Sequence, residues 1–172
     1  MKSIKIAALF FAAVLLSINV MAQTEKDVVD VAAGSEAHTT LVAAVKAADL
    51  VGTLKSKGPF TVFAPTNDAF AKLPAGTVDN LLKPENKAAL AGILTYHVVA
   101  GNLDAKAVLG AINKGKGKVV LTTVAGGKLT AAIEDGKVVL TDENGGKATV
   151  TATDLKATNG VIHVIDSVLL PK

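Results

Sequence analysis

The stretch "TVFAPTNDAFAKLP", residues 61–74, places a short strand and the start of a helix on either side of one proline. The β-branched and aromatic residues before Pro65 predict a strand over residues 60–65 that ends at the proline. Thr66 follows, and its hydroxyl is suited to accept backbone N–H groups in the first turn of a helix. A recognition loop or cation site at the polar cluster 66–68 is the alternative, and helix capping is the simpler interpretation.

Helical spacing surrounds this stretch. Residues 26–33, "KDVVDVAA", and residues 39–50, "TTLVAAVKAADL", predict two helices before it. After it, Lys83-Pro84-Glu85 begins the longest helix, because proline is tolerated at the first helical position. The helices therefore gather in the first half of the chain.

The longest helix ends in the dipeptide Tyr96-His97. One face of this helix carries, at positions i, i+3, i+4 and i+7, the residues Leu90, Ile93, Leu94 and His97. His97 thus points the same way as three aliphatic side chains, and Tyr96 lies on the adjoining side. We expect the pair to sit where the helix packs against the rest of the fold.

Beyond residue 118 the pattern changes to a period of two, with glycine-rich corners. Strands are predicted over 118–124, 128–133, 137–141 and 147–153, joined by hairpin turns. In the last of these strands Ala148, Val150 and Ala152 are expected to face inward. The segment 160–171, "GVIHVIDSVLLP", is apolar on both faces and predicts a central strand. We expect no internal repeat, and the segregated helices and antiparallel strands predict an α+β fold.

The first 22 residues have the pattern of a secretory signal peptide. Two lysines precede an apolar run from Ile6 to Val20, and small residues close it before Gln23. That run is shorter than the roughly 20 apolar residues of a membrane span. We expect cleavage after Ala22, which leaves residues 23–172 as one exported domain, periplasmic or extracellular, without stable membrane insertion.

Charge and composition argue against a nucleic acid as the partner. The whole chain has a net charge of +3, and removal of Lys2 and Lys5 leaves +1 on residues 23–172. A nearly neutral chain without arginine lacks the concentrated basic surface and the guanidinium forks that nucleic acids select. The chain also has no cysteine, so no disulfide framework holds the fold.

Three blocks in order resemble the fasciclin domain family. They are "TVFAPTNDAFAKLP" (61–74), "LKPENKAALAGILTYHVVAG" (82–101) and "NGVIHVIDSVLLP" (159–171). The resemblance covers residues 24–172 and implies a wedge of two β-sheets, sandwich-like, with helices packed around it. It also implies extracellular, periplasmic or surface proteins associated with cell adhesion and matrix contact, with no catalytic activity or cofactor general to the family. In animal members the Tyr-His region has been associated with integrin binding.

Tyr96 and His97 are the candidate partner-binding residues. The competing interpretation is that both rings fill the join between helix and sheets, with their polar tips bonded to nearby backbone. If His97 is buried and neutral, acid must charge it, so we expect stability to fall below its titration range.

Other polar clusters give weaker signals. His163, Asp166 and Ser167 are close in sequence, but strand geometry sends Asp166 to the opposite side from the other two. The histidines His38, His97 and His163 lack metal-ligand spacing.

Two loop segments also have alternative interpretations. A calcium site at 142–144 lacks a twelve-residue ligand loop, and the Asn-Gly pair there indicates a turn. The Lys/Gly segment 113–118 is most simply a solvated loop, with contact to an anionic polysaccharide as the alternative.

The sequence therefore predicts an exported, non-enzymatic binding module without a cofactor. Its expected partner is a protein or polysaccharide of a cell surface or extracellular matrix. The alternative is a carrier of a small apolar ligand in a cavity between the sheets, where small residues leave room: Ala131, Ala132, Ala148 and Ala152.

Overall fold

The structure, a computed structural model, describes residues 25–172, so the predicted signal peptide 1–22 lies outside the described residues. The helices, with the two 3₁₀ turns η1 and η2, are α1 (Val28–Ala33), η1 (Glu36–His38), α2 (Thr39–Ala47), α3 (Val51–Leu54), α4 (Asn67–Ala71), α5 (Thr77–Leu81), η2 (Pro84–Asn86), α6 (Lys87–Tyr96) and α7 (Ala105–Lys114). Within the described part of the chain, no helix combines the length and apolar character that a membrane crossing requires.

Seven strands of residues 25–172 form one continuous sheet. They are β1 (Phe60–Pro65), β2 (Val98–Ala100), β3 (Lys118–Thr122), β4 (Lys128–Glu134), β5 (Lys137–Thr141), β6 (Lys147–Ala157) and β7 (Gly160–Ile165). Their order is β2-β1-β7-β6-β5-β4-β3. All neighbours are antiparallel except β1 and β7, which run parallel.

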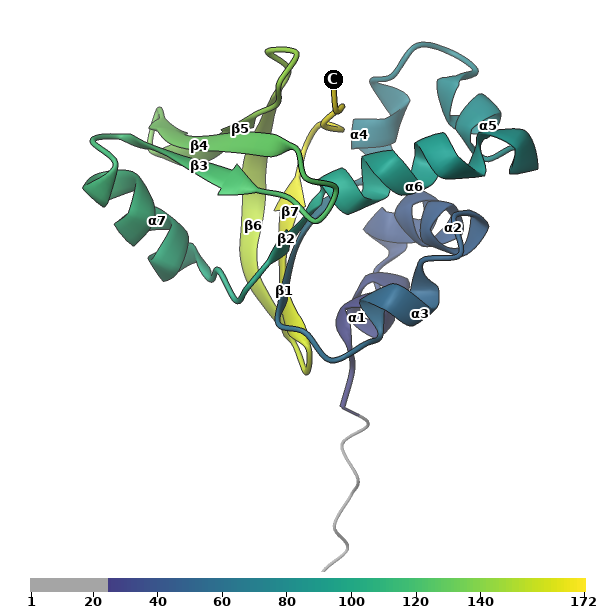
Figure 1. Ribbon diagram of the computed structural model, residues 1–172, viewed down its shortest axis with the longest axis horizontal. Coiled ribbons are helices and arrows are strands. Elements are labelled where there is room, and N and C mark those ends of the chain that lie inside the picture. Colours follow the sequence, from purple (N-terminus) through teal and green to yellow (C-terminus); the bar gives the residue numbers. More distant parts are fainter. Residues whose placement is uncertain (1–24) are drawn as a thin grey trace, which may run out of the picture.

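The sheet bends into a wedge because β6 belongs to both walls. Residues 147–149 of β6 pair with β5, whereas Val150 to Ala157 pair with β7. Two bulges lie within the second part, and Asp154 there has a positive φ of 59°. Bulges bend a strand and strengthen its twist. Figure 1 shows the result, with β3, β4 and β5 turned away from β1 and β7.

The open ends of the sheet meet at a narrow seam. Val99 of β2 forms a bridge with Thr123, and the N–H of Val124 donates to the carbonyl of Val98 at 2.7 Å. The wedge is therefore nearly a closed barrel. This confirms the α+β fold that the sequence predicts and the wedge with packed helices that the resemblance implies, with both walls of the wedge formed by one continuous sheet.

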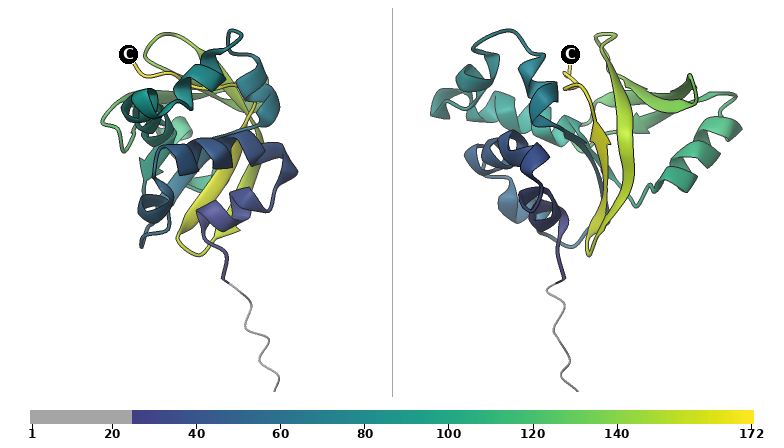
Figure 2. Two further views of the ribbon diagram at one scale, coloured as in Figure 1. Left: turned by 90° about the vertical axis from the view of Figure 1, so that its right-hand side faces the viewer. Right: turned by 180° about the vertical axis from the view of Figure 1, so that it is seen from behind.

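Two hydrophobic clusters lie on opposite sides of β1 and β7. One joins α1, α2 and α6 to the sheet and includes Val62 and Ile162. The other fills the wedge and includes Phe63 and Ile165, with α7 closing its open side. Figure 2 shows helices covering the outer side of β1 and β7. These strands are thus buried on both faces, which confirms the predicted central strand, although it ends at Ile165 rather than near residue 171.

Several features differ from the sequence expectation, including the short strand β2 and the short helix α3, which were not predicted. Ala152 is exposed, because the register shift between Val150 and Ala152 turns the strand before the inward alternation can continue. The expected strand 147–153 also extends to Ala157. Helix α7 was not predicted, although Asp104 caps its first turn by accepting the Ala107 N–H at 2.7 Å. An N-cap residue followed by an apolar i, i+4 pair was the signal that indicates this helix.

The prediction that the chain contains no internal repeat is wrong. The segments "KVVLTTVAGGKLT" (118–130) and "KVVLTDENGGKAT" (137–149) agree everywhere except at three loop positions and one strand position. Their loops also match, since Thr123 N–H donates to Gly127 O at 2.8 Å and Asp142 N–H donates to Gly146 O at 2.9 Å. The sheet therefore contains two copies of the same segment, each made of a strand, a turn and the start of the next strand.

Candidate functional site

Tyr96 and His97 lie where α6 passes directly into β2. The N–H of His97 donates to the carbonyl of Leu94 and ends the helix. The carbonyl of His97 then accepts the N–H of Phe63 on β1 at 2.9 Å. With no loop between helix and strand, the two side chains are fixed at the junction of the two hydrophobic clusters.

The ring of Tyr96 lies in the cluster inside the wedge, with no solvent exposure. Its hydroxyl donates to the carbonyl of Lys128 at 2.7 Å and accepts the N–H of Glu143 at 3.2 Å. Burial raises the pKa of the Tyr96 phenol; the N–H of Glu143 opposes the shift, and the charges of Glu143 and Asp142 add to it. The neutral phenol therefore links Lys128, where β4 begins, to the loop 142–146.

His97 is 2% exposed and has a partner on each ring nitrogen. Nδ1 is 2.8 Å from the carbonyl of Ile93, which can only accept, so Nδ1 carries the proton. Nε2 accepts the N–H of Leu169 at 3.0 Å. Burial lowers the pKa of His97 to about 4, against smaller opposing effects of the Ile93 carbonyl and the charge of Asp142. The imidazole is therefore neutral near pH 7 and holds the C-terminal segment to α6.

The C-terminal segment, residues 166–172, is also held by the loop between β5 and β6. Asp142 Oδ2 accepts the N–H of Leu170 at 3.0 Å, and the amide of Asn144 donates to the carbonyls of Leu170 and Pro171. Asp142 Oδ1 accepts the N–H groups of Asn144 and Gly146. The carboxylate of Asp142 thus accepts three backbone N–H groups. These bonds give the acidic residue at 142 a structural role, as an alternative to the calcium site considered at 142–144.

The described residues contain no group of three or more His, Cys, Asp or Glu side chains able to hold a metal ion. His163 Nε2 lies 2.6 Å from the carbonyl of Leu103, and its ring stacks on Phe63. The Ser167 hydroxyl donates to Asp166 rather than to an imidazole. His38 Nδ1 meets the hydroxyl of Ser35. The structure therefore does not assemble His163, Asp166 and Ser167 into a catalytic set.

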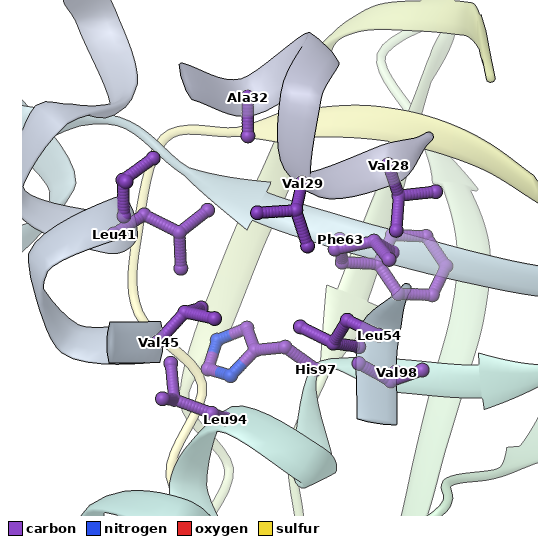
Figure 3. A pocket seen from close by; sticks show the side chains of 12 residues that line it. Val28, Val29, Ala32, Leu41, Val45, Leu54, Phe63, Leu94, His97 and Val98 are labelled. Carbon is purple, nitrogen blue, oxygen red and sulfur yellow. The ribbon is translucent and has the colours of Figure 1, made fainter. Parts of the chain in front are cut away.

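An apolar hollow lies beside His97, between α1, α2, α6 and β1. Figure 3 shows the imidazole among aliphatic side chains of these helices, including Val29, Val45 and Leu94. The hollow has a volume of about 30 Å³, and a second one, inside the wedge beside Phe63 and His163, has about 10 Å³. Each is the size of one or two water molecules, far below the several hundred Å³ of a small-molecule site.

Thr66 caps α4 by accepting the N–H of Ala69 at 3.2 Å, as the sequence predicts. The roles of two asparagine side chains were missed. The Asn67 amide donates to Glu36 O, and its oxygen accepts the N–H of Thr40. Asn159, in the turn between β6 and β7, similarly bonds Val28 N–H and the carbonyls of Leu54 and Ser56. Asn67 thus ties η1 and α2 to α4, and Asn159 ties α1 and α3 to the turn between β6 and β7. No local pattern indicates such distant partners.

We expect Gly127→Ala to disturb the Tyr96 ring. A Cβ at Gly127 would lie 2.5 Å from Cε2 and 2.8 Å from Cδ2 of Tyr96. The ring is held at its hydroxyl and cannot move freely, so the free energy of unfolding should fall by about 1–3 kcal/mol. Chemical denaturation measures this change.

The matched control is Gly92→Ala in α6. A Cβ there meets no atom within 4 Å, and alanine is the better helix former, so the free energy of unfolding should rise by about 0.5–1 kcal/mol. Unchanged stability in the Gly127 variant would show that the ring yields.

Asp142→Ala is expected to release the C-terminal segment. The substitution leaves the N–H groups of Asn144, Gly146 and Leu170 without their acceptor, which should lower the free energy of unfolding by about 1–3 kcal/mol. Urea denaturation measures the loss, with Asp79→Ala on exposed α5 as the control, expected within about 0.5 kcal/mol of the parent. Equal effects of the two variants would contradict the holding role of Asp142.

The chain is similar to a known protein family and to a solved structure. A family model described as the fasciclin domain matches residues 36–171, and the chain belongs to this family. Among solved structures, a FAS1 domain pair from the insect cell adhesion molecule Fasciclin I is similar, with a TM-score of 0.60 and 22% identity over 73% of this chain and 42% of that chain. This likeness supports the fold.

Three relatives show the range of the family. Protein sll1483 of Synechocystis sp. is 58% identical over 84% of this chain and 73% of its own length. Immunogenic protein MPB70 of Mycobacterium bovis is 38% identical over 85% and 70%. Transforming growth factor-beta-induced protein ig-h3 of Sus scrofa is 39% identical over 84% of this chain, which spans 19% of that relative.

Proposed function

We propose that the chain is an exported, non-enzymatic binding module for a protein or polysaccharide of a cell surface or extracellular matrix. Membership of the fasciclin domain family carries this proposal, and one solved structure of this fold is titled as a domain pair from a cell adhesion molecule. The sequence similarity extends over most of the chain, so the shared unit is the whole domain rather than one motif.

The state of the polar side chains supports binding rather than catalysis. His97 and His163 each use ring nitrogens on backbone groups. Ser167 donates to Asp166, away from either imidazole. A hydrolytic mechanism needs a nucleophile and a base in mutual contact, and these residues have other partners. An activity screen with esterase, peptidase and glycosidase substrates should show no turnover.

We infer that Tyr96 and His97 serve binding indirectly. Both rings are buried, and together they hold the start of β4 at Lys128, the loop 142–146 and the C-terminal segment in place. A partner would then meet the exposed residues of these segments and of the sheet, while the pair fixes their positions.

We also propose that residues 1–22 are removed on export and that residues 23–172 act as the single domain. The charged start, apolar run and small residues at the predicted cleavage site support this. Mass spectrometry of protein recovered from periplasm and culture medium should give a chain that begins at Gln23. Recovery with residues 1–22 attached would contradict it.

Binding to an envelope or matrix fraction tests the proposed function. The tagged protein is incubated with solubilised envelope, secreted matrix and cytosolic fractions of its host, and bound material is identified. We expect saturable retention of a surface or matrix component and none from cytosol. Failure to retain any component of the surface fractions would contradict the proposal.

The carrier alternative has less support, because the hollows beside His97 and His163 are about 30 and 10 Å³. A ligand that co-purifies from the native host, detected by native mass spectrometry, would favour the carrier instead.

A further inference from the structure

The duplicated hairpin places two equivalent sets of polar side chains on one sheet. A shift of 19 positions relates residues 118–130 to residues 137–149. In the sheet order, β5 lies two strands from β3, and β6 lies two strands from β4. Neighbouring strands are about 4.8 Å apart, so the two copies are offset by about 10 Å. The shift superposes Lys118 on Lys137 and Lys128 on Lys147, and it also superposes Thr122 on Thr141 and Thr130 on Thr149.

These side chains share the outer face of the wedge. Lys118 pairs with Ala132, Ala132 with Val139 and Val139 with Thr149, so one row crosses four strands on the same side. The alternate residues, such as Leu121, Leu129 and Leu140, fill the wedge. Helix α7 packs with that inner cluster, and the other described helices lie on the side of the molecule where β1 and β7 are (Figures 1 and 2). All four lysines of this outer face are exposed.

The outer face carries an excess of positive charge. Its one acidic side chain on a strand, Glu134, pairs with Lys147 across β5 at 2.7 Å. Among the described residues, no carboxylate lies within 4.0 Å of the ammonium groups of Lys118, Lys128 or Lys137. Glu143 lies near this edge but accepts the backbone N–H of Lys128. Three ammonium groups are therefore free to meet an anion.

The chemistry of the face indicates the kind of anion. Threonine hydroxyls lie between the lysines, and Val120 is 55% exposed beside them. This combination offers charge pairing, hydrogen bonds and a small apolar contact. The face has no aromatic ring on which a neutral sugar or a base would stack, and the chain has no arginine for bidentate phosphate contacts. A sugar polymer that carries carboxylates fits these groups.

We propose that the outer face of β3, β4, β5 and β6 binds an acidic polysaccharide, whose repeated carboxylates pair with the repeated lysines. The inference rests on the proposed function and names its ligand class. Because the hairpin copies are offset within one rigid sheet, a single polymer chain occupies both, and the second contact forms at high effective concentration.

Substitution of the free lysines tests this surface. The purified protein is titrated with polygalacturonate at low ionic strength, beside the triple variant Lys118→Gln, Lys128→Gln and Lys137→Gln. The control triple variant, Lys46→Gln, Lys57→Gln and Lys83→Gln, removes the same charge from exposed lysines that have no ion pair in the described structure. The face variant should bind about tenfold more weakly, and the control should change by less than about twofold. Equal losses, or none in the face variant, would overturn the proposal.

Two further probes test the ligand class. Monomeric galacturonate should bind at least about a hundredfold more weakly than the polymer, because it cannot engage both copies. Dextran should not bind, since it carries no charge. Binding of a DNA duplex as tight as that of polygalacturonate would contradict recognition of a sugar polymer. If the protein retains an envelope component but not polygalacturonate, the proposed function stands and this inference fails.

Discussion

Tyr96→Ala is expected to lower the free energy of unfolding by about 3–5 kcal/mol, which is a large share of the stability of an ordinary domain. The substitution removes a fully buried ring from the centre of the wedge and leaves a cavity there. It also removes the hydroxyl that joins the two hairpin loops at Lys128 and Glu143. Equilibrium urea denaturation at pH 7.5 measures the loss.

Tyr96→Phe separates the two contributions. The ring remains, but the carbonyl of Lys128 and the N–H of Glu143 lose their partner, so we expect a loss of about 1–2 kcal/mol. A loss below about 1 kcal/mol for Tyr96→Ala would show that the wedge closes around the gap. It would remove the basis for treating this side chain as the link between the loops.

The stability of the domain should fall by about 2 kcal/mol between pH 7.5 and 5 through His97 alone. Its pKa is about 4 in the folded chain and about 6.5 when unfolded. The unfolded state therefore binds a proton first as the pH falls. The stabilising contribution of neutral His97 is complete above pH 6.5 and is lost progressively as the pH falls. At pH 4 the loss of stability amounts to about 3 kcal/mol. Protonation also removes the acceptor for the N–H of Leu169.

His97→Gln isolates this effect from other titrating groups. Burial also lowers the pKa of His38, which adds a loss in the same direction, and Asp27 has a lowered pKa that matters at lower pH. Denaturation curves of parent and variant are measured from pH 7.5 to 5. The variant should be less stable at pH 7.5, and the difference should shrink by about 2 kcal/mol at pH 5. Parallel stability curves would contradict a neutral, buried His97.

Local sequence patterns predicted correctly those features that depend on interactions between residues close in sequence. Thr66 caps its helix because a hydroxyl three residues from a backbone N–H can reach it. Glu134-Asp135-Gly136 forms a tight turn because Asp135 and Gly136 both adopt positive φ, as a two-residue hairpin requires. The apolar character of 160–165 on both faces predicted a central strand, and β7 lies between β1 and β6.

The remaining features depend on contacts between distant segments. The bulges of β6 arise where one strand serves two walls, and they expose Ala152 against its alternation. The side chains of Asn67 and Asn159 bond backbone groups far away in sequence. The partner of His97 Nε2 is likewise Leu169, in a segment that the sequence assigned to a strand. Periodicity along one segment carries no information about such pairs.

The expected packing position of Tyr96 and His97 is confirmed, whereas their part in partner binding stays a prediction. The sequence placed Tyr96 and His97 on the docking side of α6, and the structure buries both at the joint of helix and sheet. The surface that we propose for binding is instead the outer face formed by the two copies of the repeated hairpin. Its sequence signal, two copies of "KVVLT" followed by "GGK", was present but was not recognised as a repeat.

The most direct test of the central claim compares binding and melting in the same variants. Parent, Tyr96→Phe and His97→Gln proteins are assayed for retention of the envelope or matrix component, below the melting temperature of each. We expect lower melting temperatures and unchanged binding per folded molecule, because the pair supports the fold beneath the binding surface. Lost binding with an unchanged melting temperature would contradict it and make Tyr96 and His97 the recognition site.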